Sequence, residues 1–288
     1  MSSNFPKSLD NVIGNSSAIQ EIKDAVNSAR MRNDAAPHIL LTGPAGTGKT
    51  SISELISKEM ESNFIYIMGP SVSKKQNIAL ILLGLNENDI IMIDEIHALD
   101  KSAAETFYNA MLNFELTIIG ENNEVTAIPL NKFTLIGATT NPGAMMVALK
   151  QRFREIRIQL YSPEELLLIL ETYAQILEIN IENDTLYEIA IRSRGTPRLA
   201  KYFLERVRDM VLSRKQVETI LYEDVLQMFE ESGIASDGCT RDDMKYLQIL
   251  SERFNGGPAG LASIASILGM DKEYVQSEIE PWLSSLGY

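Results

Sequence analysis

The stretch ILLTGPAGTGKT at residues 39–50 decides the fold of the first half of this chain. Its apolar start, residues 39–42, predicts a short buried strand, and residues 43–50 match the complete P-loop pattern. The small residues of such a loop let the backbone curl so that its N–H groups point at phosphates, and the helix that follows adds positive potential. We therefore expect a strand, a phosphate-binding loop and a helix in this order.

The phosphate loop predicts a role for each of its polar residues. Lys49 would reach the β- and γ-phosphates of a nucleotide, and Thr50 would ligate Mg²⁺. The other nucleotide-binding residues predicted in this stretch are Gly43, Gly46, Thr47, Gly48 and Ser51.

A second motif, IIMIDE at residues 90–95, is an apolar run that ends in two carboxylates. At the tip of a buried strand, Asp94 can hold Mg²⁺ beside Thr50, and Glu95 can polarise the attacking water as a general base. The alternative is a solvated acidic pair after a buried strand, which the P-loop earlier in the chain disfavours. We interpret His97, which follows this pair, as a structural or coupling residue.

A third motif, FTLIGATTN at residues 133–141, is another apolar run with a polar end. In a parallel sheet its tip would lie beside Asp94, where the hydroxyl of Thr139 or Thr140 can orient the lytic water or sense the γ-phosphate. The alternative is that these threonines are simply residues that favour strands.

Two arginines further along the chain are candidate phosphate contacts. Arg152 could act as an arginine finger on a γ-phosphate that a neighbouring subunit holds; the alternative is a solvated charge at a helix end. Arg198, in the stretch RGTPR at residues 194–198, could reach back over the phosphates from a second domain. The alternative for Arg198 is a helix-terminal salt bridge.

Short apolar runs alternate with helical stretches through residues 1–158. The runs lie at residues 39–42, 64–67, 90–93, 133–137 and 156–158. This pattern predicts an α/β domain with a buried parallel sheet and helices on both of its faces.

The rest of the chain has helical periodicity. Residues 159–232 predict an all-helical domain, in which Ser162 begins a capping box and Asp184 caps the second helix. A linker at residues 233–238 leads to two helical stripes that Gly256, Gly257 and Pro258 separate. We expect residues 233–288 to form a compact helix-turn-helix unit.

Composition restricts the function classes. The net charge of −13 counts against a broad electrostatic grip on nucleic acid, which depends on lysine and arginine. DNA contact would then need a few placed cations, a ring, or a partner that holds the DNA. The single cysteine, Cys239, excludes an internal disulfide and a four-cysteine zinc site. We expect no secretory signal and no membrane span, because the sequence has no signal core and no apolar run of sufficient length. A reducing cytoplasm is the default compartment.

These motifs, in this order, resemble the AAA+ superfamily, and several segments resemble its RuvB family in particular. The segments are IDEIHAL at 93–99, FTLIGATTNPG at 133–143, RSRGTPRLAK at 192–201, FNGGPAGLASIA at 254–265 and EPW at 280–282. The first three share features with other AAA+ proteins, whereas the last two are more particular to RuvB. The resemblance covers nearly the whole chain.

The resemblance implies an AAA+ ATPase domain, a helical lid and a short winged-helix domain that lacks the basic wing. It implies ATP and Mg²⁺ as cofactors, a homohexameric ring, and ATP-driven branch migration of Holliday junctions in recombination and repair. It assigns sensor 1 to Thr139 or Thr140, the arginine finger to Arg152, an adenosine contact to Tyr161 and sensor 2 to Arg198. Duplex or four-way DNA and a RuvA-like protein are the implied partners. The latter would dock on a hairpin at residues 116–130.

The chain departs from the family pattern at Phe5, Leu112, Asn113 and Asn141, where the family has other residues. It also ends at Tyr288, where the family continues into the wing. Two other functions stay open from the sequence: a clamp-loader-like or other DNA-associated AAA+ switch, and an adaptor that keeps the fold without turnover. The phenylalanine after Arg152 counts against the first, because clamp loaders typically have a cysteine there.

Overall fold

The computed structural model describes residues 6–72, 75–119 and 125–288, which form two compact units, residues 1–161 and 162–288. Phe5 therefore lies outside the described residues. The two units are described separately below.

The first unit is built on a parallel sheet with the strand order β2-β3-β6-β1-β7. The strands are β1 (Ile39–Thr42), β2 (Phe64–Met68), β3 (Ile90–Asp94), β6 (Thr134–Thr139) and β7 (Arg154–Arg157). The predicted parallel sheet is confirmed, but β7 begins before the apolar run at 156–158. The strand begins at Arg154 because this residue pairs with Ile39 of β1. Its first residues are exposed and charged, so the apolar pattern of the sequence did not predict them as part of the strand.

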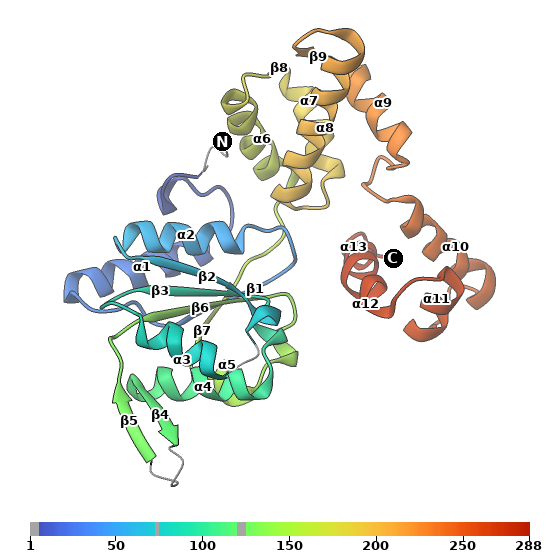
Figure 1. The fold of residues 1–288 in the computed structure, drawn as a ribbon. Helices are drawn as coiled ribbons and strands as arrows, with labels where there is room; N and C mark the ends of the chain where they lie inside the picture. The colour runs from blue at the N-terminus through green and yellow to red at the C-terminus, as the bar shows by residue number, and fades with distance from the viewer. Residues whose placement is uncertain (1–5, 73–74, 120–124) are drawn as a thin grey trace. The chain divides into compact units, whose positions relative to one another are not determined.

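Helices cover both faces of this sheet, as the sequence predicted (Figure 1). One face packs on α1 (Ser16–Arg32) and α2 (Lys49–Glu59), and the other on α3 (Lys75–Leu83), α4 (Lys101–Asn113) and α5 (Val147–Lys150). Neighbouring residues of β1 show why its run is continuously apolar. Ile39 and Leu41 join the α1–α2 core, whereas Leu40 joins the core on the opposite face.

Short 3-10 turns complete the first unit. They are η1 (Leu9–Asn11), η2 (Gly69–Ser71), η3 (Ile96–Ala98) and η4 (Pro142–Ala144). The last three come within a few residues of the ends of β2, β3 and β6. The chain therefore turns tightly at the carboxyl edge of the sheet, where parallel α/β folds carry their sites.

A β-hairpin stands apart from the sheet and corresponds to the one predicted at residues 116–130. Its strands, β4 (Glu115–Ile119) and β5 (Val125–Pro129), are antiparallel and pair Leu116 with Ile128. Figure 1 shows the two strands extending away from α4. The turn predicted from the sequence falls within residues 120–124, which lie outside the described residues.

The second unit begins with a helical bundle. Its elements are α6 (Pro163–Ile176), β8 (Asn180–Ile181), α7 (Asn183–Arg192), α8 (Pro197–Lys215), β9 (Thr219–Ile220) and α9 (Tyr222–Ser232). The predicted capping box is confirmed, because Ser162 and Glu165 hydrogen-bond each other's backbone N–H groups. The prediction that Asp184 caps α7 is wrong. The helix already begins at Asn183, so Asp184 lies in its first turn, where its negative charge interacts favourably with the helix dipole.

The chain continues into a second group of helices with its own core. These are α10 (Arg241–Phe254), α11 (Leu261–Leu268), α12 (Lys272–Tyr274), the π-helical η5 (Val275–Ile279) and α13 (Glu280–Ser285). Ile264, Val275 and Leu283 are buried between them, which fits the predicted helix-turn-helix unit. Among the described residues, no helix has the length and apolar character needed to cross a membrane.

Candidate nucleotide site

The P-loop curls between β1 and α2 in a conformation that favours glycine at two positions. Gly43 has φ +142°, and a Cβ atom placed on it would lie 2.1 Å from the carbonyl oxygen of Ile158. Gly48, the last loop residue before α2, has φ +93°. Both backbone angles are rare for residues with a side chain, so the spacing of the glycines follows from the shape of the loop.

The Lys49 side chain is directed back onto the backbone of the loop. The Lys49 ammonium donates to the carbonyl oxygens of Gly43, at 2.9 Å, and Pro44, at 2.8 Å. Tyr161, which follows β7, donates its hydroxyl to the Thr47 carbonyl at 3.1 Å. The structure thus places the Lys49 charge inside the curl of the loop and places Tyr161 against the loop from outside. Ser51 lies exposed in the first turn of α2.

The second motif meets the P-loop at the carboxyl end of β3. The Thr50 hydroxyl donates to a carboxylate oxygen of Asp94 at 3.4 Å. Hydroxyl and carboxylate oxygens are ligands that Mg²⁺ prefers, so this pair fits the predicted metal role. Among the described residues, no group of three or more His, Cys, Asp or Glu side chains could hold a metal. A magnesium ion here would therefore need phosphate oxygens and water to complete its ligands.

Sequence reasoning missed Tyr66 on β2. Its hydroxyl donates to the same oxygen of Asp94 at 3.0 Å. Burial, followed by the hydrogen bond and charge of Asp94, raises the pKa of Tyr66, so the phenol stays protonated and donates. No local pattern pointed to Tyr66, because the strand register, which pairs Met68 with Asp94, brings this end of β2 beside the carboxylate.

The structure links the predicted base to the predicted sensor through His97. Its Nδ1 lies 2.9 Å from the Thr139 hydroxyl and 3.2 Å from a carboxylate oxygen of Glu95. When Nδ1 is unprotonated it accepts from the threonine hydroxyl, and when it is protonated it donates to the carboxylate or to that hydroxyl oxygen. The Asn141 N–H donates to the Thr139 hydroxyl at 2.9 Å, and the Thr140 hydroxyl donates to Glu95 at 3.5 Å. His97 thus contacts both Glu95, which follows β3, and Thr139 on β6, and its coupling role stays a prediction.

The two predicted phosphate-contacting arginines lie in different units. Arg152 follows α5 in the first unit and is exposed. It donates to the Tyr108 hydroxyl at 3.4 Å, with its guanidinium carbon 5.2 Å from the centre of that ring. Arg198 is exposed in the first turn of α8, in the second unit. Its role stays a prediction.

Two titratable residues outside this site are held in the protein interior. Burial lowers the pKa of His38 to about 4, which keeps the ring neutral, and its Nδ1 accepts from the Leu135 N–H at 2.9 Å. Burial also raises the pKa of Cys239 to about 12, which makes this thiol unreactive.

Family models for RuvB match the chain along nearly its whole length. A Holliday junction DNA helicase RuvB P-loop domain matches residues 5–159, a RuvB AAA lid domain 161–231 and a RuvB C-terminal winged helix domain 236–288.

Curated relatives and solved structures agree with these matches. The Holliday junction branch migration complex subunit RuvB of Kosmotoga olearia is 38% identical, over 98% of this chain and 84% of its own length. The same subunit of Ehrlichia ruminantium is 39% identical, over 98% and 86%. A variant of Thermotoga maritima RuvB has a TM-score of 0.90 and 35% identity, covering 98% of this chain and 92% of its own. The chain belongs to the RuvB family of P-loop ATPases.

Proposed function

We propose that this chain is an ATP-driven motor that couples ATP hydrolysis to branch migration of Holliday junctions. The contact between Thr50 and Asp94 carries the hydrolytic part, because it joins the P-loop to the acidic end of β3. Membership of the RuvB family, over all parts of the chain, supports the DNA part.

In the proposed reaction, Lys49 and the backbone of the P-loop hold the triphosphate, and Thr50 and Asp94 hold Mg²⁺. The metal ion neutralises charge that develops on the phosphate oxygens. Glu95 orients the attacking water and takes its proton, and the products are ADP and phosphate. The Thr139 and Thr140 hydroxyls, which already contact His97 and Glu95, sense the γ-phosphate.

The remaining roles require an assembly. We assign Arg152 as the arginine finger that acts on the nucleotide of a neighbouring copy in a homohexameric ring, because it is an exposed cation. Tyr161 contacts the adenosine, and Arg198 connects the lid to the phosphates. The boundaries 1–158, 159–232 and 233–288 then separate the ATPase, lid and winged-helix domains of a cytoplasmic protein.

The hairpin formed by β4 and β5 is the proposed docking site for a RuvA-like protein. A partner that holds the DNA suits a chain with a net charge of −13, because its 39 acidic residues outnumber its 26 lysines and arginines and repel phosphates.

Unwinding of a synthetic four-way junction, measured with and without a RuvA protein, tests this function. We expect unwinding that requires ATP, increases with RuvA and disappears in Lys49→Ala. Unwinding that Lys49→Ala retains would contradict the assignment. ATP turnover without unwinding, combined with binding to a sliding clamp, would instead support the clamp-loader-like alternative.

A further inference from the structure

Arg194 connects the helices of the lid to those of the winged-helix part. It lies two residues after the end of α7 and has a left-handed backbone with φ +50°. Residues with a side chain adopt this conformation infrequently, and usually where the surrounding structure holds them in it. At this position the surrounding contacts are those of the guanidinium.

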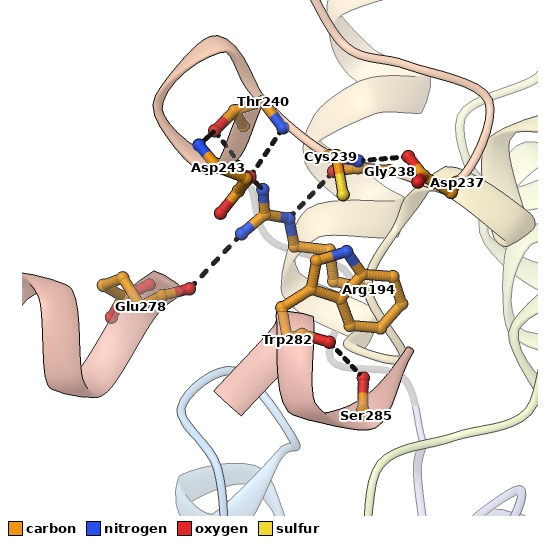
Figure 2. Close-up of polar contacts among 9 residues, drawn as sticks. All are labelled: Arg194, Asp237, Gly238, Cys239, Thr240, Asp243, Glu278, Trp282 and Ser285. Carbon is orange, nitrogen blue, oxygen red and sulfur yellow. Dashed lines mark hydrogen bonds and ion pairs between the residues drawn. The ribbon is translucent and has the colours of Figure 1, made fainter. Parts of the chain in front are cut away.

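The guanidinium binds three segments that are far apart in the sequence (Figure 2). Its Nε donates to the carbonyl oxygen of Gly238 at 3.0 Å, and one terminal nitrogen donates to that of Glu278 at 3.4 Å. The other terminal nitrogen forms an ion pair with Asp243. The ring of Trp282 lies against the same group, with its centre 5.9 Å away. One side chain therefore binds the linker, α10 and the η5–α13 segment.

The ion pair with Asp243 is buried, and the Asp243 carboxylate also caps the N-terminus of α10. The side chain of Asp243 is fully buried and that of Arg194 is 15% exposed. The same carboxylate accepts from the N–H of Thr240 at 2.6 Å and from its hydroxyl at 2.7 Å, which caps α10. Moving α10 away from Arg194 would leave a buried charge without its partner. Such a movement therefore has a large cost in free energy.

The linker between α9 and α10 is held at a second point. Arg192, at the end of α7, donates to the carbonyl oxygen of Ile234 at 3.3 Å. At the other end of the linker, Gly238 has φ +80°, and a Cβ atom on it would lie 2.9 Å from the carbonyl oxygen of Arg192. Arg192, the last residue of α7, therefore contacts the linker near both of its ends. Domains joined by a free linker move relative to each other by default, and these contacts oppose such motion.

We propose that Arg194 is a positioning residue that fixes the winged-helix part to the lid as one rigid body, so that lid movement is delivered to the DNA. The transmission of movement to DNA rests on the proposed motor function, whereas the rigid joint between the lid and the winged-helix part can be tested without DNA. Arg194 takes no part in nucleotide chemistry, because its guanidinium is committed to the joint.

A pair of spin labels tests the joint in the full chain. We place them at Leu212→Cys on α8 and Ser284→Cys on α13, both exposed, and leave the buried Cys239 unchanged. The distance distribution should be narrow in the parent protein and broaden about twofold or more in Arg194→Met. Arg214→Met is the matched control, because Arg214 forms its ion pair with Glu231 inside the lid; it should leave the distribution narrow.

A second variant guards against misfolding of Arg194→Met. Asp243→Asn removes the charge but keeps an oxygen that can accept from Thr240 and cap α10. It should broaden the distribution to an intermediate width. A distribution that stays narrow in both variants overturns the proposal.

The coupling is measured as base pairs of junction migrated per ATP hydrolysed. In Arg194→Met we expect ATP turnover close to that of the parent and a ratio lowered about 2- to 30-fold. An equal fall in turnover and migration would assign Arg194 to the ATPase instead and would contradict our proposal. If the parent protein hydrolyses ATP but moves no junction, the motor function fails, whereas the distance measurement still decides the joint.

Discussion

Arg152 and Arg194 carry the same guanidinium group, but the molecule holds them in opposite ways. Arg152 lies exposed at the end of α5 against one tyrosine ring. Arg194 is largely buried and donates to a carboxylate and two backbone carbonyl groups. A cation with unused donors at the surface can act on another molecule, whereas one whose donors are used inside the chain stabilises that chain.

The two histidines show the same contrast. His97 shares one ring nitrogen between the Glu95 carboxylate and the Thr139 hydroxyl, so its bonding can change. His38 is packed among aromatic rings that include Phe133, and its nitrogen is committed to the backbone of Leu135. Residue type alone therefore does not distinguish the two histidines, whereas the number and burial of their partners do.

The largest effect is expected at Arg152. In Arg152→Ala we expect the ATP turnover of the assembled protein to fall about 10³- to 10⁵-fold, because the charge that stabilises the transition state is lost. Steady-state phosphate release measures it. Arg154→Ala is the control, since Arg154 is also exposed and pairs with Glu21.

Mixed assemblies sharpen the test of Arg152. Arg152→Ala keeps a complete P-loop, and Lys49→Ala keeps the finger, so mixing the two should restore part of the turnover. If the mixture stays inactive while both variants assemble, Arg152 does not act between subunits.

The next largest effect is expected at Glu95. Glu95→Gln keeps the size of the side chain but cannot take a proton, so we expect turnover to fall about 10²- to 10⁴-fold. The Kd for ATP should change little, and single-turnover assays with a binding titration would separate the two. Glu87→Gln, at an exposed position before β3, should have no effect. Near-normal turnover in Glu95→Gln would assign the base to another residue.

A smaller effect, on stability, is expected at Gly43. The added methyl group of Gly43→Ala would clash with the Ile158 carbonyl in a backbone conformation that disfavours side chains, which should lower the free energy of unfolding by about 3 kcal/mol. Gly143→Ala is the matched control, because the nearest atom to its Cβ lies 3.6 Å away. Urea denaturation measures both. Equal stability of the two variants would mean that the P-loop adapts to the methyl group.

The smallest effect is expected from the pH dependence at His38. Its pKa is about 4 in the folded chain and 6.5 as the ordinary value, so the unfolded state takes up the proton first as pH falls. The stability that the neutral His38 ring contributes is therefore fully present above pH 6.5 and is lost as the pH falls toward 4. Between pH 7 and pH 5 we expect this residue to reduce the free energy of unfolding by about 2 kcal/mol.

Urea denaturation of the parent and of His38→Gln at both pH values isolates this contribution, because other titrations cancel in the difference. A parent-like slope in His38→Gln would show that His38 is not the group responsible.

Much of the first unit could be predicted from the sequence because its signals are local. The strand, loop and helix around Gly43 follow from apolar residues and glycines that are adjacent in the chain. The position of Asp94 at a strand tip follows from an apolar run that ends in a charge. The start of β7 could not be predicted, because its pairing with β1, rather than its composition, decides it.

The sequence by itself determined which residues form the P-loop and the acidic strand end, because phosphate binding needs backbone and side chains that are neighbours in the chain. Only the tertiary structure decided that Tyr66 contacts Asp94, that His97 joins Glu95 to Thr139, and that Arg194 reaches Asp243. These contacts join residues on different elements. Their partners depend on strand register and helix packing, which no local pattern of residue types specifies.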